Sequence, residues 1–185
     1  MEQPTNETNA TTTETPVSIV NTAFEENVKA KLADAMEDIV MLDMLTVTIK
    51  HNKVYEVLQI LRDEKELGFT YLTTLFGTHF PKNEHNTENL LGMTYMLHNL
   101  EKNWRIRIKT FFSIDDAQVQ SVVPLFDSAN WMEREAWDFY GIKFKGHPNL
   151  IRILNMEDIP FFPMRKDFPL EDPNRSDKDD SQFGR

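Results

Sequence analysis

Residues 129–170 decide the fold, and they read ANWMEREAWDFYGIKFKGHPNLIRILNMEDIPFFPMRKDFPL. The stretch begins with a short helical pattern over 131–140. Asn130 is placed to cap that helix, and Glu133, three residues later, completes a capping-box-like start. Gly141 stands where a helix end favours a left-handed residue. The sequence therefore predicts a helix of about ten residues that a glycine ends.

The predicted helix has an apolar arc and a charged arc. At about 100° per residue, its apolar side chains gather on one side and form an ordinary core face. The other side combines an aromatic ring with charges of both signs: Trp131, Arg134, Glu135 and Asp138. Arg134 and Asp138 have the spacing of an i,i+4 pair, which is usually a solvated surface pair. Two other interpretations stay open, a partner-binding surface and a pair that fixes the following segment within the chain.

The chain after this helix turns and then becomes rich in proline. His147 before Pro148 is interpreted as a turn residue. An apolar cluster around Arg152 predicts a return to the core: Leu150, Ile151, Ile153 and Leu154. Further on, prolines remove backbone donors and bias the residues before them to extended conformations: Pro160, Pro163, Pro169 and Pro173. Residues 158–185 are therefore predicted to be an extended arm with no sheet and no long helix.

Five motifs in this region resemble those of a known family. In chain order they are Glu133-Arg134-Glu135, Asp138-Phe139-Tyr140-Gly141-Ile142, Gly146-His147-Pro148, Arg152-Ile153-Leu154 and Arg165-Lys166-Asp167-Phe168-Pro169-Leu170. They resemble the C subunit of proton-pumping NADH:quinone oxidoreductase, respiratory complex I. The resemblance is dense over 104–170 and thinner over 23–103. Phe161 and Phe162 depart from it, because the family usually has Gly-His in those places.

The resemblance implies a structural and docking subunit of the peripheral arm of this translocase, with no catalysis by the chain alone. It implies no cofactor on the chain, whereas the complex uses FMN, iron–sulfur clusters and a quinone. The implied partners are chiefly the D subunit, which lines the quinone site, and the iron–sulfur B and I subunits. The implied location is the cytoplasmic side of the bacterial inner membrane, with membrane contact only through the complex. The equivalent subunit of a membrane-bound hydrogenase complex is the alternative within this class.

The residues predicted to contact partner subunits come from the charged arc, the turn and the arm. An arm that carries Phe and Met beside Arg needs a surface to lie on, and such residues are typical of interface centres. The predicted contact residues are Trp131, Arg134, Glu135, Asp138, His147, Arg152, Phe161, Phe162, Arg165, Lys166, Asp167 and Phe168. No catalytic, cofactor-binding or metal-binding residue is predicted.

Composition excludes several classes of protein. The 185 residues include no cysteine, which rules out disulfides, thiolate zinc sites and iron–sulfur ligation by this chain. A net charge of −10 has the wrong sign for a nucleic-acid binder or a polybasic membrane-surface protein, and it favours protein partners. No stretch approaches the roughly 18 apolar residues of a membrane span. Residues 1–21 lack the pattern of a targeting signal and are predicted to be a disordered tail.

A free-standing small hydrolase or isomerase is the alternative from a different class. The five histidines of the chain lack the spacing of a zinc site. Glu133 is explained by capping and Asp138 by Arg134, which leaves no acid–base pair beside a nucleophile. A phosphate loop and a dinucleotide fingerprint are also missing. These features favour the interaction subunit.

The rest of the chain predicts an α+β fold. Thr22 and Glu25 form a capping box for a first helix, and Asn52 opens a second helix that Gly68 stops. The predicted elements before the opening stretch are a helix over 23–41, a strand over 45–49, a helix from 52, strands over 69–77, 91–97 and 104–108, and a short helix within 113–127. We expect helices packed on a mixed sheet of about four strands, with the short helix and the long extended arm appended. The expected domains are a tail over 1–21, an α+β domain over 22–157 and the arm over 158–185.

Overall fold

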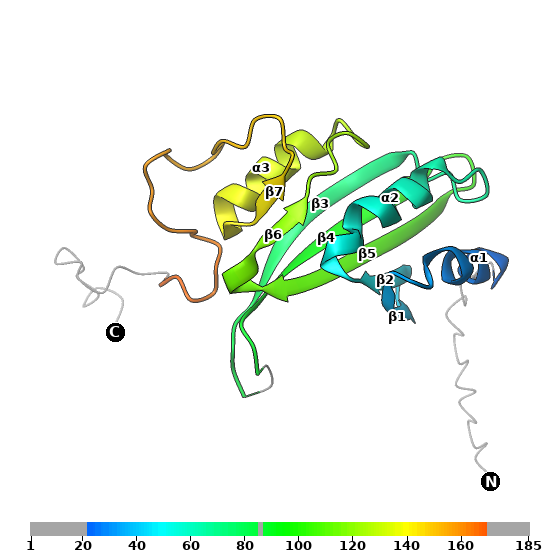
Figure 1. Ribbon diagram of the computed structural model, residues 1–185, viewed down its shortest axis with the longest axis horizontal. Coiled ribbons are helices and arrows are strands. Elements are labelled where there is room, and N and C mark those ends of the chain that lie inside the picture. Colours follow the sequence, from blue (N-terminus) through cyan, green and yellow to red (C-terminus); the bar gives the residue numbers. More distant parts are fainter. Residues whose placement is uncertain (1–21, 85–86, 170–185) are drawn as a thin grey trace, which may run out of the picture.

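A mixed five-stranded sheet organises the chain (Figure 1). The computed structural model describes residues 22–84 and 87–169. The strands of this sheet are β1 (Met36–Met41), β2 (Leu45–Ile49), β3 (Tyr71–Phe80), β4 (Leu90–Asn99) and β5 (Trp104–Ser113). They lie in the order β1-β2-β5-β4-β3, with β2 and β5 parallel and every other neighbouring pair antiparallel. The α+β class with a mixed sheet is therefore confirmed.

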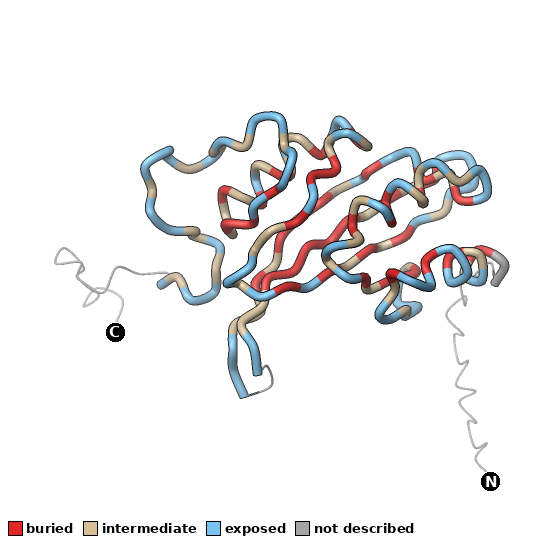
Figure 2. The backbone as a smooth tube through the Cα atoms, in the orientation of Figure 1, coloured by how far each residue is buried: buried red, intermediate tan, exposed pale blue. Residues whose placement is uncertain are grey.

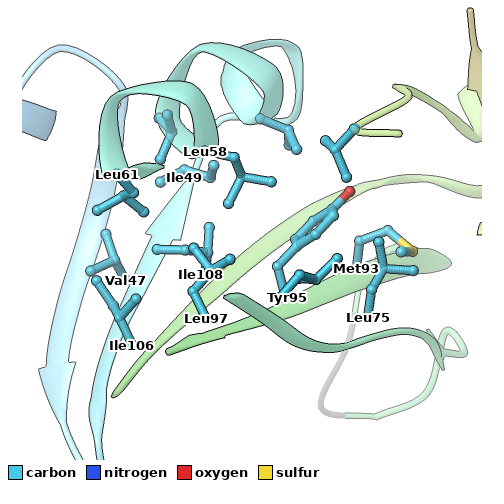
Figure 3. Close-up of a cluster of buried hydrophobic side chains, with 14 of the residues drawn as sticks. Val47, Ile49, Leu58, Leu61, Leu75, Met93, Tyr95, Leu97, Ile106 and Ile108 are labelled. Carbon is cyan, nitrogen blue, oxygen red and sulfur yellow. The ribbon is translucent and has the colours of Figure 1, made fainter. Parts of the chain in front are cut away.

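The core lies between this sheet and the helices α1 (Thr22–Leu32) and α2 (Val54–Asp63). Successive side chains of a strand face opposite sides, so Ile106 and Ile108 of β5 are buried, while Arg105, the residue before Ile106, is exposed. Leu58 and Leu61 of α2 are fully buried, and Figure 3 shows them packed near the strand residues of this cluster. Figure 2 shows the same division along the chain, with buried positions concentrated on the strands.

The predicted helix over 23–41 is wrong in its second half. α1 ends at Leu32, and residues 36–41 form β1, which pairs antiparallel with β2. The apolar residues of this segment do recur at helical spacing, but Ile39 and Val40 are β-branched and lie opposite Val47 and Thr46. Pairing with a neighbouring strand therefore outweighed the local period. This extra edge strand explains why the sheet has five strands instead of about four.

The other predicted elements of this layer are present with shifted boundaries. The strand over 45–49 is β2, and the β4–β5 hairpin pairs Tyr95 with Ile108. β3 runs to Phe80, beyond the predicted end at 77. α2 begins at Val54, after a 3₁₀ turn over His51–Lys53. It ends at Asp63, so Gly68 follows the helix and does not stop it.

A second group of elements lies beyond β3. It contains β6 (Gln118–Gln120), α3 (Ala129–Tyr140) and β7 (Lys143–Lys145), and β6 and β7 pair in parallel. The short helix expected within 113–127 is replaced by a 3₁₀ turn over Ile114–Asp116 and by β6. α3 packs on β3 so closely that a Cβ on Gly77 would lie 2.7 Å from the ring of Tyr140. None of the helices within residues 22–169 that the structure describes is long and apolar enough to cross a bilayer.

Candidate functional site: α3 and the segment that packs on it

The helix predicted from the opening stretch is α3, and its end is confirmed. Gly141 has φ 77° and its N–H donates to the carbonyl of Trp137 at 2.8 Å. The predicted start is wrong. α3 begins at Ala129 after Ser128, whose side chain makes no capping hydrogen bond, so Asn130 lies inside the first turn. The cap fails because the chain enters the helix through backbone turn bonds, including Ala129 N–H to the carbonyl of Phe126 at 3.0 Å.

Glu133 is buried and forms no capping box. Its side chain points into the fold, where Oε1 accepts the Val122 N–H and Oε2 accepts the Ser121 hydroxyl, both at 2.7 Å. The residue has 0% exposure. Burial raises the pKa of Glu133 to about 7, although both hydrogen bonds act to lower it. A carboxylate that the sequence explains by capping is therefore a core group.

Asp138 is the second fully buried carboxylate of α3. Its Oδ1 accepts hydrogen bonds from Nη1 of Arg152 at 2.7 Å and from Nδ2 of Asn155 at 3.0 Å. Its Oδ2 accepts the backbone N–H groups of Ile153, Leu154 and Asn155 at 3.2, 2.9 and 3.0 Å. Burial alone would raise the pKa of Asp138, but the hydrogen bonds from Asn155, Leu154 and Arg152 outweigh burial and hold it well below the usual range. Asp138 thus binds three successive residues of the loop over 149–157 to α3.

Arg152 extends this attachment to the arm. Its Nη2 donates to the carbonyls of Ile159 at 2.8 Å and Phe161 at 3.4 Å. Its guanidinium also lies over the rings of Trp137 and Phe162, at 5.5 and 5.4 Å from their centroids. The side chain is only 8% exposed. Arg152 is therefore an anchor between α3, the loop and the arm, and its contact with a partner subunit stays a prediction.

The predicted i,i+4 pair between Arg134 and Asp138 is absent. Arg134 turns the other way, and its Nε and Nη2 donate to the carbonyls of Ile151 at 3.1 Å and Arg152 at 3.3 Å. Its guanidinium lies 5.2 Å from the ring centroid of Trp131. The loop offers Asp138 a cation and three N–H donors that a helix neighbour cannot match. The interpretation that Arg134 and Asp138 fix the following segment within the chain agrees with these bonds.

The described part of the arm, residues 158–169, lies on its own domain. Arg165 Nε donates to the carbonyl of Tyr140 at 2.7 Å, and the Met164 N–H donates to the carbonyl of Phe139 at 3.3 Å. The rings of Phe161 and Phe168 stack with centroids 4.6 Å apart. This part of the arm contains no helix or strand, as expected. The rest of the arm, 170–185, and the predicted tail, 1–21, lie outside the described residues.

A buried histidine of β3 holds the far end of this segment. His79 Nδ1 accepts the Lys166 N–H at 2.8 Å, and Nε2 lies 2.6 Å from Oδ1 of Asn89. The Lys166 bond requires Nδ1 without a proton, so the Nε2–H donates to Asn89. The carboxylate of Asp167 lies 4.0 Å from the same Nδ1. No motif spacing pointed to His79, because Lys166 lies 87 residues farther along the chain.

The predicted contact residues separate into three groups by exposure. The side chains of Asp138 and Arg152 are interior. His147 is half-buried; its Nε2 lies 3.1 Å from the Asn130 carbonyl, and its Nδ1 accepts the Asn149 N–H at 3.0 Å. Arg134, Phe162, Arg165 and Phe168 are half-buried, and the exposed group is Trp131, Glu135, Phe161, Lys166 and Asp167. The residues of the predicted charged arc therefore do not share one environment. Asp138 is buried, Arg134 is half-buried, and Trp131 and Glu135 are exposed.

Three exposed apolar residues escape prediction from the sequence. Ile151 and Leu154 were expected to return to the core, but they are 43% and 63% exposed, and Met156 beside them is 70% exposed. Leu150 is the one member of that cluster that packs against the core as expected. Asp138 holds this loop through the backbone N–H groups of residues 153–155, so Leu154 is fixed by its backbone while its side chain faces outward. Trp131 is also exposed, at 67%. We call these four residues, Trp131, Ile151, Leu154 and Met156, the outer apolar surface.

The chemistry within reach of this site is limited. Among the described residues, no group of three or more His, Asp or Glu side chains is placed to hold a metal ion. A cleft of about 470 Å³ between the 3₁₀ turn after β5 and the arm is lined by Asp115, Asp116, Lys143 and Arg165, and its lining includes no Ser, Thr, Cys or His. The arrangement can hold segments together and present apolar surface. The Ser121 hydroxyl donates to the Glu133 carboxylate, but both residues are fully buried.

Comparisons with known proteins assign a family to this architecture. Residues 47–174 match the family model of the respiratory-chain NADH dehydrogenase, 30 Kd subunit. Two similar curated proteins are the C subunits of NADH-quinone oxidoreductase from Burkholderia mallei (strain SAVP1) and from Burkholderia pseudomallei (strain 668). Each is 40% identical over 151 residues, which cover 80% of this chain and 76% of that protein.

Two solved structures share the fold. A trypsin-resistant fragment of Nqo5 aligns with TM-score 0.55 and 27% identity, covering 70% of this chain and 98% of the fragment. A chain of the membrane-bound sulfane sulfur reductase, an archaeal respiratory membrane complex, aligns with TM-score 0.66 and 22% identity, covering 80% of this chain and 85% of that chain. The second likeness concerns the fold alone. Together with the sequence matches, these results show that the chain belongs to the family of the respiratory-chain NADH dehydrogenase 30 Kd subunit, which is the C subunit of NADH-quinone oxidoreductase.

Proposed function

We propose that this chain is a structural and docking subunit in the peripheral arm of a proton-translocating NADH:quinone oxidoreductase. It packs chiefly against the D subunit, which lines the quinone site, and also contacts the iron–sulfur B and I subunits. FMN, iron–sulfur clusters and quinone belong to the other subunits, in keeping with a chain that has no cysteine to ligate a cluster. The complex holds the chain on the cytoplasmic side of the bacterial inner membrane.

The outer apolar surface is the observation that carries this proposal. Its four side chains, Trp131, Ile151, Leu154 and Met156, are each more than two-fifths exposed and lie on α3 and the adjoining loop. We propose that these four side chains form one contiguous patch, which is the kind of surface that marks protein interaction sites. Arg134 borders this surface and lies over the ring of Trp131. Trp and Arg are the residue types enriched among the strongest contributors to protein interfaces.

The loop behind this surface is rigidly held. Asp138 accepts three successive backbone N–H groups of the loop, and Arg134 donates to two of its carbonyls. A surface whose backbone is already fixed loses less conformational entropy when a partner binds. The bond of Asp138 to the Leu154 N–H and the bond of Arg134 to the Ile151 carbonyl therefore support docking indirectly, by fixing the backbone that carries these exposed side chains.

The exposed arm residues extend the proposed interface. Phe161, Lys166 and Asp167 are exposed, and they remain predicted partner contacts. The half-buried residues Phe162, Arg165 and Phe168 attach the arm to the domain instead. The arm thus adds contact area next to the outer apolar surface.

Two other functions are less well supported. The equivalent subunit of a different membrane-bound complex is favoured by the fold shared with the sulfane sulfur reductase, but that likeness has 22% identity against 40% for the quinone oxidoreductase subunits. A free-standing hydrolase or isomerase would need a nucleophile and a base in a concave site. The cleft beside the arm is lined by carboxylates and cations without them.

A pair of surface substitutions tests the docking proposal. The double variant Trp131→Ser with Leu154→Gln removes two large members of the outer apolar surface and leaves the Asp138 bonds in place. We expect it to fold with unchanged stability and to be lost from the membrane complex, with lower NADH:quinone oxidoreductase activity of the membranes. Native gel electrophoresis of membranes from cells that carry only the variant measures incorporation.

Leu100→Gln is the matched control. Leu100 is 62% exposed in the turn between β4 and β5, so the substitution removes a similar exposed apolar side chain elsewhere. We expect normal incorporation of this control. Incorporation of the double variant at the level of the control would refute the docking surface. Deleting residues 158–185 tests the arm separately, and unchanged incorporation of that deletion would refute the arm contacts.

A further inference from the structure

We infer that Glu133 is a buried proton-binding site that exchanges a proton with solvent, and that its charge state sets the hydrogen bonds that join α3 to the turn after β6. The inference goes beyond the docking role and does not depend on any partner. It concerns the isolated chain, where Glu133 joins α3 to the turn that follows β6.

The site is closed and contains only neutral donors. Glu133 has 0% exposure, and its two hydrogen bonds come from the Ser121 hydroxyl and the Val122 N–H. Within the described part of the chain, no Lys, Arg or His side chain donates to it. A buried carboxylate without a cation carries a large desolvation cost, which protonation removes.

The charged groups on the surrounding elements are engaged elsewhere. Arg62 of α2 pairs with Asp63 and donates to the carbonyl of Leu125 at 3.0 Å. Arg134, next to Glu133 on α3, donates to the carbonyls of the loop on the other side of the helix. From β4 the facing group is the phenol of Tyr95. These elements leave Glu133 without a compensating positive charge.

Tyr95 supplies an independent observation. Its hydroxyl is fully buried and has no hydrogen-bond partner among the described residues. Figure 3 shows this hydroxyl at the edge of the core cluster, pointing away from the aliphatic side chains of the sheet. Burial raises the pKa of Tyr95 first of all, and the charge of Glu133 raises it further. A buried hydroxyl without a partner shows that this part of the core leaves polar groups uncompensated, and Tyr95 gives Glu133 no hydrogen bond that would hold it charged.

Proton binding has a defined consequence for the contacts of Glu133. In the charged form both oxygens accept, as the structure shows. A proton from solvent on Oε2 reverses the bond to Ser121, so that the acid O–H donates and the Ser121 oxygen accepts. The bond from the Val122 N–H to Oε1 is kept in both forms. Loading the proton removes the desolvation cost of the buried charge, and it changes the bonds between α3 and the 121–122 turn from charge-assisted to neutral.

The test follows Glu133 and Val122 by NMR in the full-length chain, from about pH 4 to about pH 9. We expect the side-chain carboxyl carbon of Glu133 to titrate near pH 7, and the Val122 amide resonance to move with the same midpoint. Glu133→Gln removes both titrations, because the amide keeps the hydrogen bonds without binding a proton. Glu135→Gln is the matched control on the exposed side of α3 and leaves both titrations intact.

Two results would overturn the inference. One is a Glu133 carboxyl midpoint in the range of exposed glutamates, roughly pH 4. The other is a Val122 amide that follows the same pH profile in the Glu133→Gln variant as in the wild type. The wild-type midpoint alone decides the question if the Gln variant does not fold.

Discussion

Glu133 and Asp138 lie five residues apart on the same helix, and both are fully buried, yet their surroundings push them in opposite directions. Glu133 faces the sheet side and meets only two neutral donors. Asp138 faces the arm side and meets Arg152 and a row of backbone N–H groups. The pKa of the first is raised to about 7 by burial, and the pKa of the second is held well below its usual range by its donors, despite burial.

The difference teaches that burial by itself does not fix the state of a carboxylate. A cation and several donors compensate the lost hydration of Asp138, so this residue stays charged and serves as an attachment point. Two neutral donors compensate Glu133 only in part. One side of α3 is therefore a permanent electrostatic joint with the loop over 149–157, while the other side depends on proton binding.

Removing the charge of Asp138 should have the largest effect. We expect Asp138→Asn to lower the free energy of unfolding by about 3 kcal/mol, because it leaves the largely buried Arg152 without its counter-charge. Urea denaturation at neutral pH measures the loss. Glu135→Gln, an exposed carboxylate on the same helix, should change stability by less than about 0.5 kcal/mol. Equal stability of the two variants would mean that Asp138 is not the joint described here.

The pH dependence of stability sharpens the comparison. The displacement of the Glu133 pKa from 4.5 to about 7 corresponds to roughly 3 kcal/mol. Because the folded-state pKa lies above the unfolded value, this stabilisation is fully present below about pH 4.5 and is lost as the pH rises through about 7. Asp138 has the opposite sign, and its contribution is lost as the pH falls below its ordinary value of 3.8.

The measurement is a series of urea unfolding curves for the wild type and Glu133→Gln. We expect the stability of the wild type relative to the variant to fall between about pH 5 and about pH 8. A constant difference over this range would show that Glu133 titrates alike in the folded and unfolded chain.

A pair of glycines tests the arm side without touching a charge. Gly141 and Gly146 have φ of 77° and 80°, so alanine costs each about 1 kcal/mol of backbone strain. A Cβ at 141 would also lie 2.5 Å from the Phe162 ring and 2.7 Å from Nη2 of Arg165, whereas at 146 the nearest atom is 3.5 Å away. We expect both variants to lose stability, and only Gly141→Ala to expose the arm to limited proteolysis. Equal protection of the arm in both variants would contradict the close packing on Gly141.

The smallest effect is expected on the outer apolar surface. Trp131→Ala should change the free energy of unfolding of the isolated chain by less than about 0.5 kcal/mol, because the ring is 67% exposed. Trp137→Ala should cost more, since its half-buried ring contacts Arg152. Thermal unfolding of the two variants checks the order. A larger loss for Trp131→Ala would place this residue in the fold and remove it from the docking surface.

Local signals predicted much of this region, and distant contacts explain where they failed. The glycine that ends α3 and the irregular arm follow from backbone restrictions that act within a few residues. The predictions of the Asn130 cap and of the Arg134–Asp138 pair also used only residues within one helical turn of each other. The actual partners are more distant in sequence: Val122 lies 11 residues from Glu133, and Arg152 lies 14 residues from Asp138. The β1 strand was misread for the same reason, since its partner strand decides its conformation.

The sequence by itself determined the α+β class, the position of α3, the proline-rich arm and the family motifs, because periodicity, glycine, proline and order of motifs are properties of the chain alone. Only the tertiary structure decided which charged residues became internal joints and which apolar side chains stayed outside. The physical reason is that a buried carboxylate must find donors wherever the fold brings them. Asp138 found them in the backbone of a loop that includes Leu154, whose side chain is left 63% exposed.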